Sequence, residues 1–413
     1  MTRLVMKFGG TSMADPERIL HAARLVQSEV EAGRKVAVVV SAMAGVTNQM
    51  VAWTDIIGPA AQGLPSSDDE YDVVVTSGEQ VTTGLMAMAL RSLGVPARSW
   101  LSWQAGIITD GVHGKAKVVA IEADDMAASI DSGVVAVIPG FQGVTRQGRL
   151  TALGRGGSDT SATAVAAALD CPCDIYTDVD GVFTTDPRLN VHARMLPRIS
   201  YEEMLELASL GAKVLHSRSV GLAMCHRTPL RVLNSRLKPG EQHGKGTLVC
   251  HEDEILEQRI VSGVTLSADE SRITLMGLPE DPTTLGRIFT LLGEAELNVD
   301  MIVQSPARME GRGNLLFTVG RRDADKAVRL LAAEPLLKDA EINKDDGVAK
   351  VSIVGAGMRS HADVAGTLFR ALADKGVPVQ AVATSEIKIS VLVDGAWGEL
   401  AARALHTAFE LDA

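Results

Sequence analysis

The chain has 413 residues, of which 46% are hydrophobic, 22% charged and only 3% aromatic, and its formal net charge at pH 7 is −11. This negative charge argues against nucleic acid or an anionic membrane as the main partner. No stretch reaches the roughly 18 uninterrupted apolar residues that a membrane span needs. The N-terminus shows no signal-peptide pattern either, so we expect a cytoplasmic protein.

The first part of the chain, to about residue 233, alternates apolar runs with amphipathic segments. Helices are expected at 16–32, with Asp15 as N-cap, at 80–93 and at 161–169. Strands are expected at the valine- and isoleucine-rich runs 4–8, 36–40, 73–76, 134–138 and 174–177. Such alternation predicts an α/β domain whose mostly parallel central sheet is sandwiched by helices. Ligands of such sheets bind at the carboxyl ends of the strands.

The last third of the chain contains an internal repeat. With an offset of 80 residues, Gly286 matches Gly366 and Phe289 matches Phe369 in register. Each copy has the pattern of a strand, a loop, an amphipathic helix and a strand, which predicts two related α+β, ferredoxin-like modules. The predicted boundaries are a domain at 1–235, a linker at 236–261, and modules at 262–343 and 344–413.

The four cysteines predict free thiols. Cys171, Cys173, Cys225 and Cys250 are too few and too scattered for a disulfide framework. The C-x-C spacing of the first two differs from that of a redox C-x-x-C pair, and we expect no metal site.

Two glycine-containing segments predict sites for anions. Residues 154–160, Gly-Arg-Gly-Gly-Ser-Asp-Thr, lie between a strand-like run and an alanine-rich helix. Glycine lets the backbone approach a ligand, a helix start favours negative charge, and Arg155 adds a bidentate donor. Residues 7–12, Lys-Phe-Gly-Gly-Thr-Ser, place a cation beside a bare backbone, although this is neither a P-loop nor a dinucleotide fingerprint. Each segment, taken alone, is also compatible with a structural turn.

Side chains in several further loops are each compatible with two roles, one structural and one in ligand binding. The hydroxyls of 41–48 could cap a helix or bind a ligand, and Glu79 could complement a helix dipole or bind an ammonium group. Residues 177–188 suit a nucleotide loop better than a calcium loop, since the D-x-[DN]-x-[DN]-G order is absent. Lys213 could be a second active-site lysine or a solvated helix residue. Without a G-x-S-x-G elbow or an H-x-x-x-H pair, this inventory favours phosphoryl transfer.

These loops, in this order, closely resemble those of the aspartate kinases of the amino-acid-kinase superfamily. The motifs at 7–12, 77–79, 154–159, 177–181 and 186–188 match the family pattern nearly letter for letter, and the likeness covers essentially the whole chain. The C-terminal repeats resemble the paired ACT modules with which such enzymes sense end-product amino acids. The resemblance implies that ATP phosphorylates the side-chain carboxylate of L-aspartate to 4-phospho-L-aspartate, the first step toward lysine, threonine and methionine.

The resemblance also implies residue roles. Catalytic residues would be Lys7, which stabilises charge on the transferring phosphoryl group, Arg155, Asp159 and Asp178. L-Aspartate would be bound by Ser41, Thr47, Glu79, Arg155, Ser158 and Asp159. Arg155 would take its α-carboxylate, while Glu79 and Asp159 would hold its ammonium group. ATP would be held by Lys7, Phe8, Gly9, Gly10, Thr177, Asp178, Phe183, Thr184, Thr185, Asp186, Pro187, Arg188, Lys213 and Val214. Mg²⁺ would be held mainly through the ATP phosphates.

For regulation, the resemblance implies inhibition by lysine, threonine or both, and a homo-oligomer in which ACT modules of two chains pair. The implied effector-binding residues are Glu280, Asp281, Asn298, Asp300, Gln304, Thr384, Ser385 and Glu386. The sequence departs from the family at Thr283, Asp363 and Pro378, where a side chain can narrow the effector site, so weakened inhibition is the alternative. Two rival functions are a kinase for another amino acid and an amino-acid-sensing protein with an inactive kinase fold. The second rival predicts loss of Lys7, Arg155 or Asp178, and all three are present.

Overall fold

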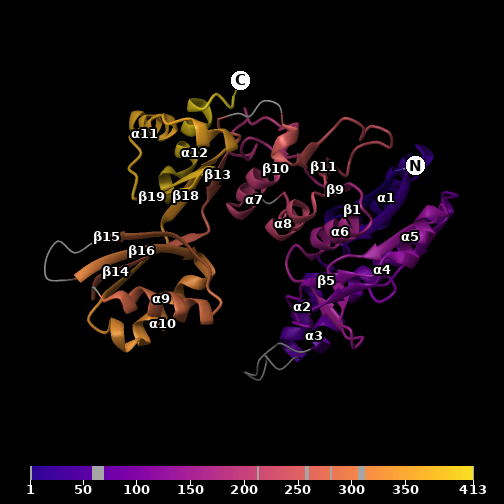
Figure 1. The fold of residues 1–413 in the computed structure, drawn as a ribbon, viewed down its shortest axis with the longest axis horizontal. Helices are drawn as coiled ribbons and strands as arrows, with labels where there is room; N and C mark the ends of the chain where they lie inside the picture. Colours follow the sequence, from indigo (N-terminus) through magenta and orange to yellow (C-terminus); the bar gives the residue numbers. More distant parts are fainter. Residues whose placement is uncertain are drawn as a thin grey trace. The chain divides into compact units, whose positions relative to one another are not determined.

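A computed structural model describes residues 2–57, 69–211, 214–255, 260–279, 281–305 and 312–412. The chain divides into two compact units (Figure 1). The first unit comprises Met1–Val182, Met195–Ser209 and Lys213–Leu256, and the second comprises Phe183–Arg194, Leu210–Ala212 and Glu257–Ala413. The short segment Phe183–Arg194 therefore belongs to the second unit, although the predicted boundary at 235 places it in the first domain.

An eight-stranded sheet forms the centre of the first unit. In spatial order its strands are β10 (Arg198–Ser200), β12 (Thr247–Cys250), β11 (Leu230–Asn234), β9 (Cys173–Thr177), β1 (Arg3–Phe8), β2 (Lys35–Val40), β6 (Val135–Pro139) and β3 (Ala97–Ser99). Of the pairs formed by these strands only β11–β12 is antiparallel, so the predicted mostly parallel sheet is confirmed.

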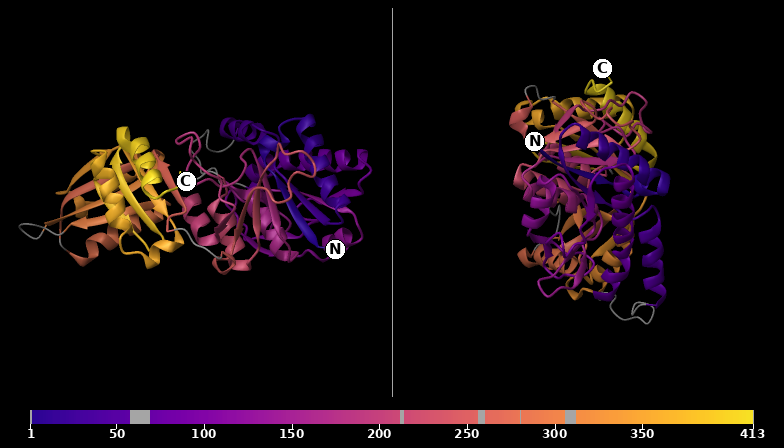
Figure 2. Two further views of the ribbon diagram at one scale, coloured as in Figure 1. Left: turned by 90° about the horizontal axis from the view of Figure 1, so that it is seen from above. Right: turned by 90° about the vertical axis from the view of Figure 1, so that its right-hand side faces the viewer.

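Helices cover both faces of this sheet (Figure 2). Leu4, Met6 and Phe8 of β1 pack in one core cluster with helices α1 (Pro16–Glu31) and α4 (Ser77–Ser92). The intervening Val5 is also fully buried, as expected for a strand between two helical layers. The remaining helices of the unit are α2 (Val46–Ile57), α3 (Asp69–Val75), α5 (Asp124–Asp131), α6 (Gly157–Ala168), α7 (Tyr201–Ser209) and α8 (Ser217–His226).

A smaller sheet of four strands completes the first unit. Its order is β5 (Val118–Ile121), β4 (Ile107–Thr109), β7 (Gln142–Val144) and β8 (Leu150–Ala152). Its strand β8 ends just before the predicted anion-binding segment 154–160, so this sheet sets where that segment begins.

The predicted strand at 73–76 is wrong. These residues continue helix α3 toward α4, because the buried positions Asp72, Val75 and Glu79 recur at helical spacing while Val73 and Val74 are more than one third exposed. Acidic Asp69, Glu70 and Asp72 in the first turn favour a helix start. The predicted N-cap is confirmed, since the Asp15 side chain accepts a hydrogen bond from the Arg18 N–H.

The second unit holds two four-stranded sheets. The first has the order β15 (Val299–Ser305), β16 (Arg312–Gly320), β14 (Glu270–Pro279), β17 (Glu341–Asp345), and it packs against α9 (Pro282–Glu294) and α10 (Arg321–Ala333). The second has the order β13 (Gly263–Ser267), β18 (Val348–Val354), β20 (Lys388–Asp394), β19 (Ala381–Thr384), with α11 (Val364–Asp374) and α12 (Gly398–Ala408). Short 3₁₀ helices occur at Gly10–Met13, Glu252–Glu254, Pro335–Leu337, Ala356–Ser360 and Gly395–Trp397.

The two modules exchange a strand. β13 lies at the start of the predicted first module but pairs with β18 of the second, from Gly263 opposite Val354 to Ser267 opposite Lys350. The 80-residue repeat gives no sign of this exchange because its matches begin at Ile273, beyond β13. The predicted module boundaries at 262, 343 and 344 therefore remain proposals. They assign β13 to the first module, whereas β13 lies in the sheet of the second.

Buried Lys350 joins the two modules. Its ammonium group lies 2.5 Å from Glu270 Oε1 and 2.7 Å from Asp300 Oδ2, and its side chain is 5% exposed. Burial lowers the pKa of Lys350, but Glu270 and Asp300 outweigh burial, and the net pKa is raised. One cation thus links β14 and β15 of the first module to β18 of the second.

The described residues contain no helix that is both long and apolar enough to cross a membrane. All four cysteines are free thiols, as predicted, with Cys225 exposed and the other three buried.

Candidate active site

A cavity of about 350 Å³ lies at the carboxyl ends of β1 and β2. The start of α4 and the turn into α6 complete its walls. It is lined by nine of the predicted site residues: Lys7, Gly9, Gly10, Ser41, Thr47, Glu79, Arg155, Ser158 and Asp159. These residues come from four separate stretches of the sequence, which the central sheet brings to one edge.

Lys7 and Asp159 form an ion pair inside this cavity. Lys7 Nζ lies 2.5 Å from Asp159 Oδ1, with side chains only 10% and 14% exposed. A Cβ atom on Gly9 would come within 3.3 Å of that ammonium group, so glycine keeps the space beside Lys7 open. Asp159 lies in the first turn of α6, where the amide groups lack partners within the helix. A cation and a helix start therefore face the same space.

The turn before α6 depends on glycine. Gly156 has φ +72°, a left-handed conformation, and a Cβ atom there would lie 2.2 Å from the ring of His216. This turn places exposed Arg155 at the cavity. Within the described residues Arg155 makes no ion pair, so its guanidinium group remains available for an anion.

Glu79 is a buried carboxylate with one oxygen in use. Glu79 Oε1 accepts a hydrogen bond from the Ala42 N–H at 3.1 Å, while Oε2 has no hydrogen-bond partner among the described residues. The side chain is 3% exposed, and burial raises its pKa from 4.5 to about 7. A buried, half-satisfied carboxylate is suited to a ligand ammonium group, which would supply the missing charge and donor.

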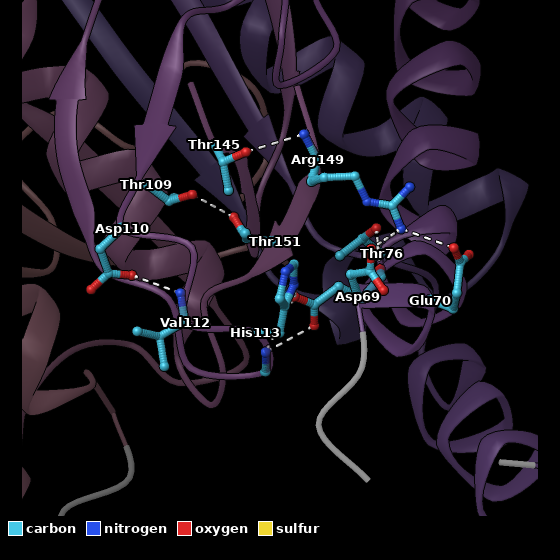
Figure 3. Close-up of polar contacts among 12 residues, drawn as sticks. Asp69, Glu70, Thr76, Thr109, Asp110, Val112, His113, Thr145, Arg149 and Thr151 are labelled. Atoms are coloured by element: carbon cyan, nitrogen blue, oxygen red, sulfur yellow. Dashed lines mark hydrogen bonds and ion pairs between the residues drawn. The ribbon is translucent and has the colours of Figure 1, made fainter. Parts of the chain in front are cut away.

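Asp72 fixes α3, and so the start of α4, to the small sheet. Its buried carboxylate lies 2.7 Å from His113 Nδ1 and accepts from the Gly114 N–H at 3.0 Å. Figure 3 shows His113 within this group of polar contacts, with Arg149 between Asp69 and Glu70 nearby. Burial raises the pKa of Asp72, although bonds from the Ala152 and Gly114 backbone and from His113 oppose the shift.

Residues that the sequence did not single out also shape the cavity. Arg218 donates to the carbonyl oxygens of Leu153 and Ala116, both at 2.6 Å, and so fixes the backbone just before the segment 154–160. Phe141 lines the cavity with φ +67°, an unusual conformation for a side chain of its size. Neither belongs to a recognisable motif, since an arginine in a helix and a phenylalanine after glycine are common.

The remaining predicted nucleotide residues do not line this cavity. Phe8 is buried and its ring stacks on Tyr176, with centroids 4.8 Å apart. Asp178 is exposed and accepts a 3.3 Å hydrogen bond from the Thr177 hydroxyl, and Val214 is half-buried. Lys213 lies outside the described residues.

The predicted segment Phe183 to Arg188 belongs to the second unit and is internally ordered. The Arg188 guanidinium Nη2 lies 2.6 Å from Asp186 Oδ2, and this arginine lowers the pKa of the Asp186 carboxyl. The backbone carbonyl of Asp186 accepts from the N–H groups of Leu189 and Asn190, which closes a tight turn.

The predicted effector residues lie in the two modules. A cavity of about 400 Å³ beside the start of α9 is lined by Asp281 and Gln304, whereas Glu280 lies outside the described residues. Asn298, Thr384, Ser385 and Glu386 are exposed. Asp281 also accepts from the Thr283 N–H at 2.7 Å as N-cap of α9, and Asp300 is paired with Lys350.

The described parts of the chain hold no group of three or more His, Cys, Asp or Glu side chains able to bind a metal ion.

Comparisons with known proteins show the family to which the chain belongs. Residues 2–234 match the model of the amino acid kinase family, and residues 351–409 match an ACT domain model. The chain is 46% identical to the aspartate kinase of Pseudomonas fluorescens SBW25, over 100% of this chain and 98% of that protein. It is 43% identical to aspartokinase 2 of Bacillus subtilis, with the same coverage.

Solved structures agree over 98% of the chain. Aspartokinase III of Escherichia coli in complex with aspartate and ADP superposes with a TM-score of 0.79 at 26% identity, covering 98% of this chain and 99% of that one. The same enzyme in complex with lysine and aspartate gives a TM-score of 0.75 at 25% identity, with the same coverage.

The chain therefore belongs to the amino acid kinase family. Within that family it falls among the aspartate kinases, which match it from end to end in sequence and in fold.

Proposed function

We propose that this protein is an ATP-dependent aspartate kinase, which transfers the γ-phosphoryl group of ATP to the side-chain carboxylate of L-aspartate. The observation that carries the proposal is the single cavity in which Lys7, Glu79, Arg155 and Asp159 meet. Two cations and two carboxylates around a small space complement a substrate with two carboxylates, an ammonium group and an incoming phosphate.

The substrate is oriented by charge. Arg155 takes the α-carboxylate as a bidentate pair, and Glu79 receives the ammonium group at its unpartnered Oε2. The hydroxyls of Ser41, Thr47 and Ser158 line the same cavity and supply hydrogen bonds. With these groups held, the side-chain carboxylate faces the Lys7 end of the cavity, and positioning supplies much of the rate acceleration.

Phosphoryl transfer then needs no nucleophile from the protein. A carboxylate oxygen of aspartate attacks the γ-phosphorus, the bond from that phosphorus to the β–γ bridging oxygen breaks, and ADP leaves with the electron pair. Lys7 stabilises the charge that spreads over the transferring oxygens. Its pairing with Asp159 holds it in place beside Gly9. Thr177, Asp178 and the segment Phe183 to Arg188 bind the nucleotide.

Mg²⁺ is a proposed partner of the nucleotide. It neutralises phosphate charge when bound, and it would be held mainly through the ATP phosphates, as its preference for retained waters favours. Asp178 is an exposed carboxylate that precedes the proposed nucleotide loop.

Regulation and assembly complete the proposal. Lysine, threonine or both bind the ACT modules and lower activity, with the cavity at Asp281 and Gln304 as the proposed effector site. Two chains pair through these modules. The edge position of β15 in its sheet and the half-exposed Ile302 on it support this, because an edge strand favours pairing with another strand.

The test is ADP release with L-aspartate, and with L-glutamate in its place, each with and without lysine plus threonine. We expect turnover that depends on aspartate and that the effectors reduce. Turnover only with glutamate would reject aspartate as the substrate, and ATP binding with no turnover on either would favour an inactive sensor. Sedimentation equilibrium of the same sample tests the oligomer.

A further inference from the structure

The proposed nucleotide loop, Phe183 to Arg188, contacts helix α12 through a hydrogen bond to His406. His406 lies on α12 and its side chain is fully buried. Its Nε2 lies 2.8 Å from the hydroxyl of Thr184, which is the second residue of the loop and is itself fully buried. All of these residues belong to the second unit.

The contacts assign the proton positions on His406. Its Nδ1 lies 2.6 Å from Asp412 Oδ1, and an ionised carboxylate only accepts, so Nδ1 carries the hydrogen. Nε2 of the neutral ring is then an acceptor, and the Thr184 hydroxyl donates to it. Burial lowers the pKa of His406 and so favours the neutral ring, and this effect outweighs the opposite effect of Asp412.

The same hydroxyl organises the rest of the loop. Thr184 Oγ1 accepts from the Arg194 N–H at 3.0 Å, and the Thr184 N–H donates to the Arg194 carbonyl at 2.8 Å. Just beyond the loop, Asn190 Nδ2 donates to Asp412 Oδ1 at 3.4 Å, and it lies 3.0 Å from His406 Nδ1, which is itself a donor. The Thr184 carbonyl accepts from the Val264 N–H at 2.7 Å, on strand β13. Thr184 near the start of the loop and Asn190 just beyond its end are therefore both fixed to the second ACT module.

We propose that His406 is a positioning residue for ATP: through Thr184, and through Asp412 to Asn190, it holds the loop Phe183 to Arg188 in its binding conformation, and makes helix α12 part of the nucleotide site's support. This inference rests on the proposed function of that loop. It implies that a shift of α12 changes ATP affinity before it changes aspartate affinity. His406 touches neither substrate, and it acts through the loop alone.

The test compares His406→Asn with His406→Gln in the full-length protein. Asparagine can reproduce the contact of Nδ1 with Asp412 but leaves Thr184 without its acceptor, whereas glutamine can reach the position of Nε2. We expect His406→Asn to raise the KM for ATP about tenfold, with the KM for aspartate changed less than twofold. His406→Gln should restore most of the ATP affinity. Thr184→Val should have the same effect as His406→Asn, and the double variant should add little to either.

Leu405→Ala is the matched control for mere destabilisation. Leu405 is the neighbouring buried residue on α12, and it packs in the module core. We expect it to lower the melting temperature at least as much as His406→Asn without changing the ratio of the two KM values. Equal changes in both KM values for His406→Asn, or no change in either, would overturn the proposal.

Equilibrium binding of ATP by calorimetry separates this inference from the proposed function. If the wild-type protein binds ATP but has no aspartate-dependent turnover, the proposed substrate fails, and weaker ATP binding by His406→Asn alone still supports the positioning role. ATP affinity that is identical in the wild type, His406→Asn and Thr184→Val contradicts the positioning role whether or not aspartate is the substrate.

Discussion

Glu79 makes aspartate binding depend on pH near neutrality. Its pKa in the folded protein is raised to about 7 by burial, so lowering the pH through 7 protonates it, and the neutral carboxyl group loses its attraction for the substrate ammonium group. We expect the KM for aspartate to rise by up to about tenfold per pH unit below 7, because the ionised fraction falls by that factor. Initial rates between pH 6 and 8 measure this.

The control is Glu79→Gln, which cannot ionise. We expect a raised KM for aspartate that no longer varies with pH over the same range, and a KM for ATP close to that of the wild type. The folded state also gains stability as pH falls, because its Glu79 binds a proton more tightly than the unfolded chain does, whose pKa stays near 4.5. A wild-type KM for aspartate that is flat between pH 6 and 8 would exclude Glu79 as the ammonium partner.

Substitution of Arg155 should affect the KM for aspartate and the KM for ATP very differently. It lies at the cavity without an ion-pair partner among the described residues, so its removal leaves little unsatisfied within the protein. We expect Arg155→Ala to raise the KM for aspartate at least about 100-fold, since a charge-assisted bidentate pair contributes roughly 3 kcal/mol. The KM for ATP should change far less. Arg155→Lys should recover only part of the loss, because lysine lacks the planar fork. Equal effects on both substrates would remove Arg155 from its role.

At the scale of elements, Asp72 is the anchor of α3. Its carboxylate is buried and holds His113 and the Gly114 N–H. Asp72→Ala leaves buried donors unpaired, and we expect it to lower the free energy of unfolding by about 3 kcal/mol. Asp69→Ala, three residues earlier on the same helix, removes only a partly exposed partner of Arg149, and we expect it to have little effect. Urea denaturation of both variants measures the difference.

Asp72→Ala should also weaken aspartate binding, because α3 leads directly into α4 and its Glu79.

Among the helices and strands, one element was predicted wrongly from the sequence. Three consecutive valines at 73–75 predict a strand, but only Val75 is buried. The helix is held in place by Asp72, whose partners lie on a loop distant in the sequence. A pattern of apolar residues cannot show such a long-range contact. Lys7 and the segment before α6, which line one cavity, stand out in the sequence because glycine and charge are local signals.

At the scale of the whole molecule, Lys350 should couple the two modules. Removing its charge leaves Glu270 and Asp300 without the cation that pairs with both of them. We expect Lys350→Ala to destabilise the second unit by about 3 kcal/mol and to weaken the response to lysine and threonine, with turnover in their absence largely kept. Calorimetric unfolding and inhibition curves test this. Lys344→Ala is the control, since that lysine also pairs with two carboxylates, at a more exposed position. Unchanged inhibition in Lys350→Ala would show that the modules act separately.

The overall arrangement was predictable only in part. The parallel sheet and the two modules follow from the alternation of apolar segments and from the repeat, which are properties of neighbouring residues. The attachment of Phe183 to Arg194 to the second unit, and of β13 to the second sheet, joins residues that are up to about 220 positions apart. Neither has a signal in composition or spacing.

The strand exchange affects the order in which the chain can fold as it is synthesised. β13 leaves the ribosome about 80 residues before β18, its partner in the sheet. At roughly 5–20 residues per second, that strand waits several seconds without a neighbour. The first module, complete by residue 345, can close during this interval. The loop at Thr184 waits longer still, since its histidine partner follows it by 222 residues. A nascent chain therefore cannot complete the contacts of its proposed nucleotide loop until helix α12 has been made.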